Sequence, residues 1–214
     1  MDEDFSIISS NTRRDRIKKF FIDNKKKLIS LLSIIILILI SYFTYDEFKK
    51  KRQISLSNEY NIILIEFDID NKEVTINKLV NLINKKDPTY SLLALYFIID
   101  NNLIADNDMI NSLFDILINE TSLEKEIKNL VIFKKALLNA DYYDEGNMLA
   151  VLNPLINSDS IWKSHALYLM AEFFYFKGEK KKAKEFFTQI IKITDSNPDI
   201  KLQAQKRLNR DLSE

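Results

Sequence analysis

The longest uncharged stretch of the chain, LISLLSIIILILISYFTY from Leu28 to Tyr45, constrains the fold more than any other feature. As a helix with about 1.5 Å rise per residue, these eighteen residues would cover roughly 27 Å, close to the ~30 Å hydrocarbon core of a bilayer. Aromatic residues gather at its C-terminal end, where rings prefer the headgroup region: Tyr42, Phe43, Tyr45 and Phe48. We therefore predict one transmembrane helix over residues 28–45.

A cleaved signal peptide is the alternative interpretation of this stretch. Such a peptide has an apolar region of about 7–15 residues followed by small residues at the cleavage site. Here the apolar run is longer, and aromatic residues and then DEFKKKR follow it. These differences favour an uncleaved anchor.

The distribution of basic residues predicts the orientation of the anchor. Residues 1–27 contain eight basic and five acidic side chains, whereas only the KKKR cluster at 49–52 follows the span closely. Basic residues are enriched in the cytoplasmic loops of membrane proteins, and long following domains translocate largely regardless of charge. We expect a cytoplasmic basic tail over 1–27, and a domain over 46–214 on the far side of the membrane.

Composition excludes several kinds of chemistry. The chain has no cysteine, so it has no disulfide, thiol nucleophile or thiolate metal site. Its two glycines, Gly146 and Gly178, cannot supply a phosphate-binding or dinucleotide-binding glycine loop. Residues 46–214 hold 23 basic and 26 acidic side chains without a long basic block, which argues against nucleic acid. We expect no cofactor, no metal site, no small-molecule substrate and no enzymatic activity.

After the span, apolar residues recur with helical spacing almost everywhere. All prolines and glycines fall in or beside short polar joints between these segments. In the DYYDEGN joint at 141–147, we expect the acidic groups to lie near the positive N-terminal end of the next helix. The predicted helices are 46–67, 73–86, 89–101, 107–118, 122–140, 145–157, 159–177, 179–194 and 198–210.

The stretch 161–195 has the spacing of a tetratricopeptide hairpin. A small residue, Ala171, is followed by Phe174, the turn glycine Gly178, the small Ala183 and then Phe187. Small residues let two helices approach, and larger groups fill the space around them. The stretches 90–118 and 129–155 keep the two-helix rhythm and the apolar stripe but fewer of these residues. The predicted fold is all-α, with an N-terminal transmembrane helix followed by a tetratricopeptide-like stack of hairpins, an α-solenoid.

Four side chains in the first helix of this hairpin fall on its inner side, which lines the concave surface of repeat proteins: His165, Tyr168, Glu172 and Tyr175. We consider them a candidate partner-binding groove, and packed or solvated positions are the alternative. His165 is the single histidine, so a catalytic triad would have to be built around it. We expect no catalytic role there.

Three segments carry a resemblance to a known family: IKKFFIDNKKK at 17–27, TYSLLAL at 89–95 and IWKSHALYLMAEFFYFKGEKKKA at 161–183. The juxtamembrane segment has basic residues, two Phe, an acidic residue and Asn before the span. The last segment has Trp, a helix and a Gly-acidic-Lys turn that leads to Ala. From about Arg14 to Lys201 the chain resembles the ancillary SecYEG translocon subunit family.

The resemblance implies a location and partners. It implies a single-pass protein of the bacterial inner membrane, with a cytoplasmic N-terminus and a tetratricopeptide-like domain in the periplasm. Its expected partners are Sec translocon subunits, a periplasmic chaperone and emerging secretory chains. A cell-envelope or division-coordinating scaffold is the first alternative, and a small-ligand-binding protein or enzyme is the second. An enzyme should bring several polar side chains together in one pocket.

Overall fold

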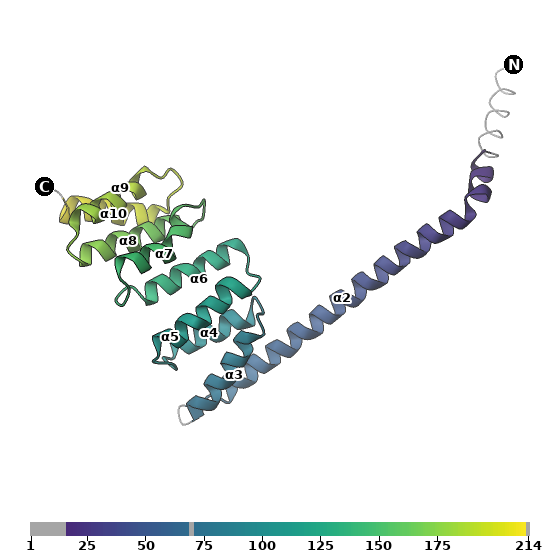
Figure 1. Cartoon of the computed structure of the whole chain (residues 1–214), viewed down its shortest axis with the longest axis horizontal. Coiled ribbons are helices and arrows are strands. Elements are labelled where there is room, and N and C mark those ends of the chain that lie inside the picture. The colour runs from purple at the N-terminus through teal and green to yellow at the C-terminus, as the bar shows by residue number, and fades with distance from the viewer. Residues whose placement is uncertain (1–15, 69–70, 213–214) are drawn as a thin grey trace, which may run out of the picture. The chain divides into compact units, whose positions relative to one another are not determined.

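The computed structural model describes residues 16–68 and 71–212, and all regular secondary structure in these ranges is helical. The all-α prediction is confirmed at this level. Residues 1–15 of the predicted tail lie outside the described residues. After the long helix α2 (Figure 1), the elements are α3 (Lys72–Asn84), α4 (Tyr90–Asp100), α5 (Asn107–Asp115), the π-helical turn η2 (Ile116–Glu120), α6 (Lys125–Leu138), α7 (Glu145–Ile156), α8 (Lys163–Phe176), α9 (Lys180–Lys192) and α10 (Pro198–Asp211).

Helix α2 (Lys25–Ile65) runs without a break through the predicted span and beyond it. The separate helix predicted over 46–67 is therefore a continuation of the apolar helix, because neither glycine nor proline interrupts the chain there. Asp46 pairs with Lys50 at 2.7 Å, and Glu47 pairs with Lys51 at 3.7 Å, one turn apart in each case. The most apolar window of α2 is not covered by any other residue that the structure describes. By length and composition, α2 suits a membrane span or a signal sequence.

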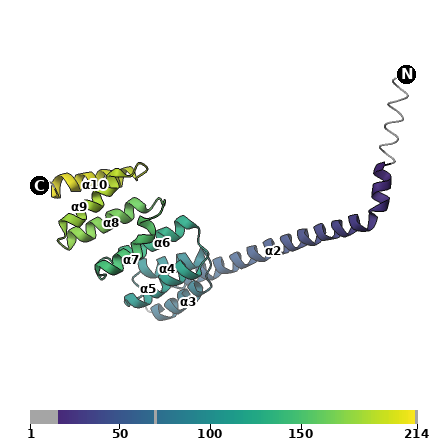
Figure 2. The same cartoon turned by 45° about the horizontal axis from the view of Figure 1, so that its top comes forward.

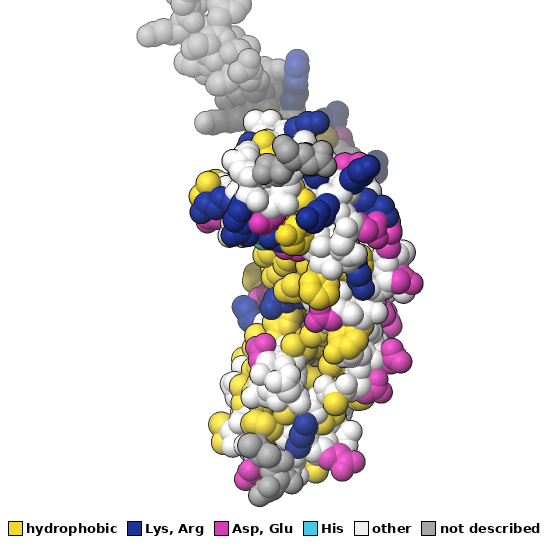
Figure 3. Space-filling model, turned by 90° about the vertical axis from the view of Figure 1, so that its left-hand side faces the viewer, with side chains coloured by type: hydrophobic (Ala, Val, Ile, Leu, Met, Phe, Trp, Pro, Cys, Tyr) yellow, Lys and Arg dark blue, Asp and Glu magenta, His cyan; other side chains and the backbone are white. Residues whose placement is uncertain are grey.

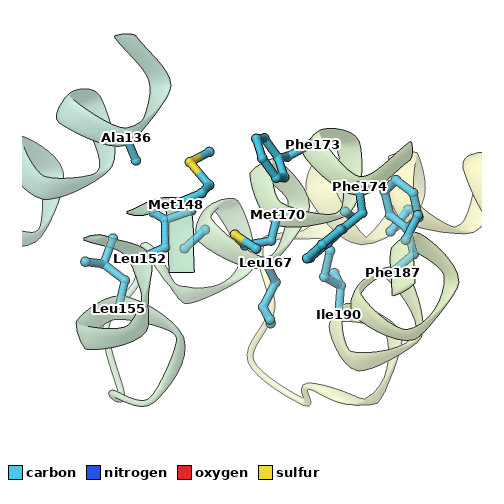
Figure 4. Packing of buried hydrophobic residues seen from close by; sticks show 14 of the residues in the cluster. Ala136, Met148, Leu152, Leu155, Leu167, Met170, Phe173, Phe174, Phe187 and Ile190 are labelled. Atoms are coloured by element: carbon cyan, nitrogen blue, oxygen red, sulfur yellow. The ribbon is translucent and has the colours of Figure 1, made fainter. Parts of the chain in front are cut away.

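The chain divides into two compact units, Met1–Ser57 and Asn58–Glu214. In the second unit, α8 and α9 form the most extensive helix pair. Ala171 and Ala183 have no exposed surface, and Phe187 and Ile190 are also completely buried (Figure 4). The predicted apolar stripe of α8 is buried as expected, with Leu167, Met170, Ala171 and Phe174 in the core.

Gly178 ends α8 as predicted, with φ +80°, in the left-handed region that glycine adopts without steric cost. The Glu179 amide donates to the Phe174 carbonyl at 2.8 Å, and the Gly178 amide donates to the Tyr175 carbonyl at 3.0 Å. This pair of hydrogen bonds is the Schellman motif, which satisfies the last carbonyls of a helix. The chain can then reverse within three residues and begin α9 at Lys180.

The helices in the first half of the domain pair differently from the two-helix hairpin that we predicted over 90–118. Helix α4 packs more extensively against α3 than against α5. The Asp87 carboxylate accepts hydrogen bonds from the Thr89 and Tyr90 amides, both at 2.9 Å, and the Ser91 hydroxyl donates to the Leu82 carbonyl at 3.0 Å. These bonds fix the short α3–α4 turn, whereas residues 101–106 separate α4 from α5.

Polar contacts tie α5 to α6. The side-chain amides of Asn111 and Asn139 donate to each other, at 3.0 and 2.8 Å. The Lys135 ammonium donates to the Asp115 carboxylate at 2.7 Å, although the Lys135 side chain is almost buried. A buried amide or ammonium is costly unless it is hydrogen-bonded, so these pairs specify which faces of the two helices meet.

In the next joint, the Asp144 side chain accepts a hydrogen bond from the Asn147 amide at 2.7 Å and caps α7, as expected for the acidic groups at 141–147.

Candidate interaction surface

The four predicted groove residues occupy one face of α8. His165, Tyr168, Glu172 and Tyr175 follow each other at intervals of three or four, which places them in one row along a helix. Each of them is half-buried. Their partners differ from one end of the row to the other.

Aromatic side chains surround the first member of the row. The rings of Phe133 and Trp162 stack with centroids 5.8 Å apart, and the His165 ring lies 5.1 Å from Trp162 and 6.0 Å from Phe133. Burial lowers the pKa of His165 below 6.5, and the nearby Ile161 carbonyl offsets this only in part. Burial thus favours the neutral form of the imidazole, which packs between Phe133 of α6 and Trp162.

The next side chain, Tyr168, joins the row to the core. Its ring meets the edge of Phe187 with centroids 5.4 Å apart. Burial raises the pKa of Tyr168 to about 12, and hydrogen bonding to the Glu172 carboxylate adds to this effect. The phenol thus stays protonated and acts as a hydrogen-bond donor, rather than as a base.

A residue of α10 engages the other end of the row. Arg207 Nε and Nη2 donate to the two carboxylate oxygens of Glu172, at 2.7 and 2.6 Å. The same guanidinium lies 4.2 Å from the centroid of the Tyr175 ring and also pairs with Asp211. Glu172, followed by Asp211, raises the pKa of Arg207 above its ordinary value. A bidentate Arg–carboxylate pair and a cation–π contact are among the stronger polar interactions.

Glu172 and Tyr175 are thus partnered within the chain, and α10 lies against this end of the row. Sequence analysis did not anticipate Arg207, because it is 35 residues from Glu172 and no spacing rule connects the two. The part of the row that is not held by Arg207 comprises His165 and Tyr168.

A cleft lies between α4, α5 and α6, and no sequence pattern predicted it. Its volume is about 350 Å³, and its lining is mostly apolar: Tyr96, Ile99, Asp100, Phe114, Lys134, Leu137 and Leu138. The Lys134 ammonium sits 4.2 Å from the centroid of the Tyr96 ring. Burial raises the pKa of Tyr96 to about 12, so its hydroxyl remains neutral. The one available signal was the polar-tipped Tyr96 within the otherwise apolar segment 92–99.

The polar groups of the α8 row and of the cleft beside Tyr96 are engaged with neighbouring side chains. Glu172 is neutralised by Arg207, and His165 is surrounded by aromatic rings. Among residues 16–68 and 71–212, no three His, Asp or Glu side chains lie close enough to hold a metal ion together. One face of the helical domain instead shows hydrophobic side chains along its middle, with lysine and arginine gathered toward the C-terminal helices (Figure 3).

Comparison of the chain with protein-family models, with curated proteins and with solved structures gives no significant match. The resemblance to the ancillary translocon subunits therefore stays a prediction. It depends on the segments 17–27, 89–95 and 161–183.

Proposed function

We propose that this chain is a noncatalytic scaffold for protein–protein interactions that is tethered to the bacterial inner membrane and works as an accessory subunit of the Sec translocon. One observation carries the proposal: the apolar segment of α2 is long enough to cross a membrane, and no other residue that the structure describes covers it. Eighteen uncharged residues without a protein partner would be unstable in water, whereas a bilayer covers them. The domain would then be held within a short distance of the membrane.

The packing of α8 and α9 supports a tetratricopeptide-like register for the domain. Ala171 and Ala183 are completely buried where α8 and α9 form the most extensive helix contact, and Phe174 and Phe187 fill the core beside them. Gly178 makes the turn at the position that the repeat spacing requires. Repeats of this kind stack because a single hairpin cannot bury its own apolar face.

The surface chemistry supports a protein partner rather than a substrate. The cleft beside Tyr96 is apolar, and Leu137 at its edge is 53 % exposed. Such a cleft suits an apolar side chain of a partner, while Lys134 can orient a carbonyl or carboxylate. Because a single span confines the domain near the membrane, weak contacts gain from a raised effective concentration. Translocon subunits, a periplasmic chaperone and emerging secretory chains are the partners that we propose.

Topology is the first test. Protease added to spheroplasts should digest the chain beyond about residue 46 and leave the N-terminal tail protected. Protection of the domain together with digestion of the tail would reverse the assignment.

Site-specific photo-crosslinking tests the partners. Probes at Tyr168 and Leu137 should capture a periplasmic chaperone or a secretory chain, and probes within residues 31–40 should capture a channel subunit. A probe at Lys184, on the exposed side of α9, is the matched control and should not capture the same partners. If the span and cleft probes capture no export component in membranes rich in channel subunits, the translocon proposal fails. Capture of envelope or division proteins instead would establish the alternative scaffold.

The cleft beside Tyr96 also favours a second candidate, the binding of a small apolar ligand, because its volume of about 350 Å³ lies within the range of ligand pockets. Native mass spectrometry of the protein purified from membranes separates the two. A bound small molecule that is lost in Leu137→Asp would support the ligand, and a ligand-free chain that still crosslinks from Leu137 would support the scaffold.

A further inference from the structure

A groove lies where the chain approaches the predicted span from the cytoplasmic side. Residues 16–23 are helical, the chain turns at Asn24, and α2 begins at Lys25. Figure 2 shows the change of direction between this first helical segment and α2. We call this region the elbow. The groove has a volume of about 600 Å³ and is lined by Lys18, Phe21, Ile22, Lys25, Leu28, Ile29 and Leu32.

The lining residues lie on one face of the chain. Residues three or four positions apart follow one another both before and after Asn24, which places them in a single row along the helices. Lys18 and Lys25 supply the only charged groups of this row, and the other members are apolar. From Leu28 onward the row belongs to the predicted span, so its apolar part continues into the hydrocarbon. The groove is therefore basic at the membrane surface and apolar below it.

The two lysines differ from Lys50 and Lys51, which follow the span. Lys50 pairs with Asp46 at 2.7 Å, and Lys51 pairs with Glu47 at 3.7 Å. Neither Lys18 nor Lys25 forms an ion pair with any residue that the structure describes. Residues 16–27 hold six basic side chains and one acidic side chain. The described residues of the elbow thus carry an excess of positive charge.

We propose that the elbow binds one anionic phospholipid, with its phosphate at Lys18 and Lys25 and its acyl chains along the apolar part of the groove. The proposal rests on the proposed membrane span. An amphiphile with an anionic head matches both parts of the groove, because basic groups next to a span attract anionic headgroups and the apolar row meets acyl chains. A water-soluble anion would leave the apolar residues that line the groove uncovered. A zwitterionic lipid such as phosphatidylcholine offers the same phosphate, but its own ammonium group offsets that negative charge and weakens the attraction to the two lysines.

Native mass spectrometry of the full chain tests this site. The protein is released from nanodiscs that contain equal amounts of phosphatidylglycerol and phosphatidylcholine with the same acyl chains. We expect one phosphatidylglycerol to be retained in preference to phosphatidylcholine. Since a lysine near the surface contributes about a fivefold gain in affinity for anionic lipid, the double variant Lys18→Gln/Lys25→Gln should lower the retention at least about 25-fold.

The matched control is Lys19→Gln/Lys26→Gln, which removes the same charge from the same segment but from residues that do not line the groove. Its retention should fall less than that of the groove variant, because both variants lose the general attraction of two surface lysines and only the groove variant also loses the contact with the bound phosphate. Equal losses in the two variants would overturn the site and leave only a general attraction to anionic lipid. Equal retention of phosphatidylglycerol and phosphatidylcholine by the unaltered chain would also overturn it.

The outcome is separable from that of the proposed function. A chain that does not enter the nanodiscs would overturn both the span and the lipid site. A chain that inserts but shows no difference between the two double variants would overturn the lipid site alone. Loss of crosslinking to the export machinery, with the lipid preference intact, would overturn the translocon proposal and leave the lipid site standing.

Discussion

Ala183→Leu tests the packing on which the helix-hairpin interpretation depends. Ala183 has no exposed surface and lies in α9, the helix that packs most extensively against α8. It belongs to the same core cluster as Ala171, Phe174 and Phe187. Three additional carbon atoms at this position have no space unless the two helices separate or neighbouring side chains leave their preferred rotamers.

Overpacking of this kind costs about 1–3 kcal/mol of unfolding free energy. For a domain of 150–250 residues, each kcal/mol lowers the melting temperature by about 2–4 °C, so we expect a decrease of roughly 2–12 °C. Trp162, the single tryptophan, stacks on Phe133 in the helical domain. Its fluorescence therefore reports thermal unfolding of this domain even when the whole chain is held in detergent micelles.

Ala150→Leu is the matched control, because Ala150 is exposed on α7 and the substitution is chemically the same. Exposed changes of this type alter stability by less than about 0.5 kcal/mol, so its melting curve should be nearly unchanged. Equal melting temperatures for Ala183→Leu and the unaltered chain would refute the close approach of α8 and α9. A large decrease for Ala150→Leu would show that the effect does not come from burial.

Three further substitutions test other features of the domain in the same thermal assay. Gly178→Ala should lower the free energy of unfolding by about 1–2 kcal/mol, because the φ of Gly178 is +80°. Gly146→Ala in α7 should leave the stability unchanged or raise it by up to about 1 kcal/mol. Equal effects of the two substitutions would contradict the turn assigned to Gly178. Arg207→Gln should lower the free energy of unfolding by about 1–3 kcal/mol, because the bidentate pair with Glu172 is lost. Arg210→Gln, at an exposed position, should lower it distinctly less. A larger effect of Arg210→Gln would contradict the role assigned to α10. Because the pKa of His165 is lowered in the folded chain, the unfolded chain binds more protons below pH 6.5, and this residue makes the free energy of unfolding fall as the pH decreases. His165→Gln should therefore reduce the dependence of the melting temperature on pH between pH 7 and 5. An unaltered dependence would contradict the burial of His165.

Local patterns in the chain predicted most of the helices within a few residues. Pro88, Gly146, Gly178 and Pro198 lie in or beside the joints between them, and they act through backbone geometry that does not depend on distant contacts. The buried stripe of α8 followed from its apolar spacing, and the turn at Gly178 followed from the repeat pattern. The continuity of α2 was missed, because a change from apolar to charged residues was interpreted as the end of a helix.

The candidate surface was predictable only in part. The row from His165 to Tyr175 shares a helix face, and helical spacing alone places its members together. The sequence by itself thus determined the helices, the apolar segment and this row, because each depends on residues within one or two turns of each other. The tertiary structure decided that Arg207 of α10 holds Glu172 and Tyr175, that Tyr96 and Lys134 meet at a cleft, and that α4 packs chiefly on α3. Those contacts join distant residues, and they depend on how the helices pack as a whole.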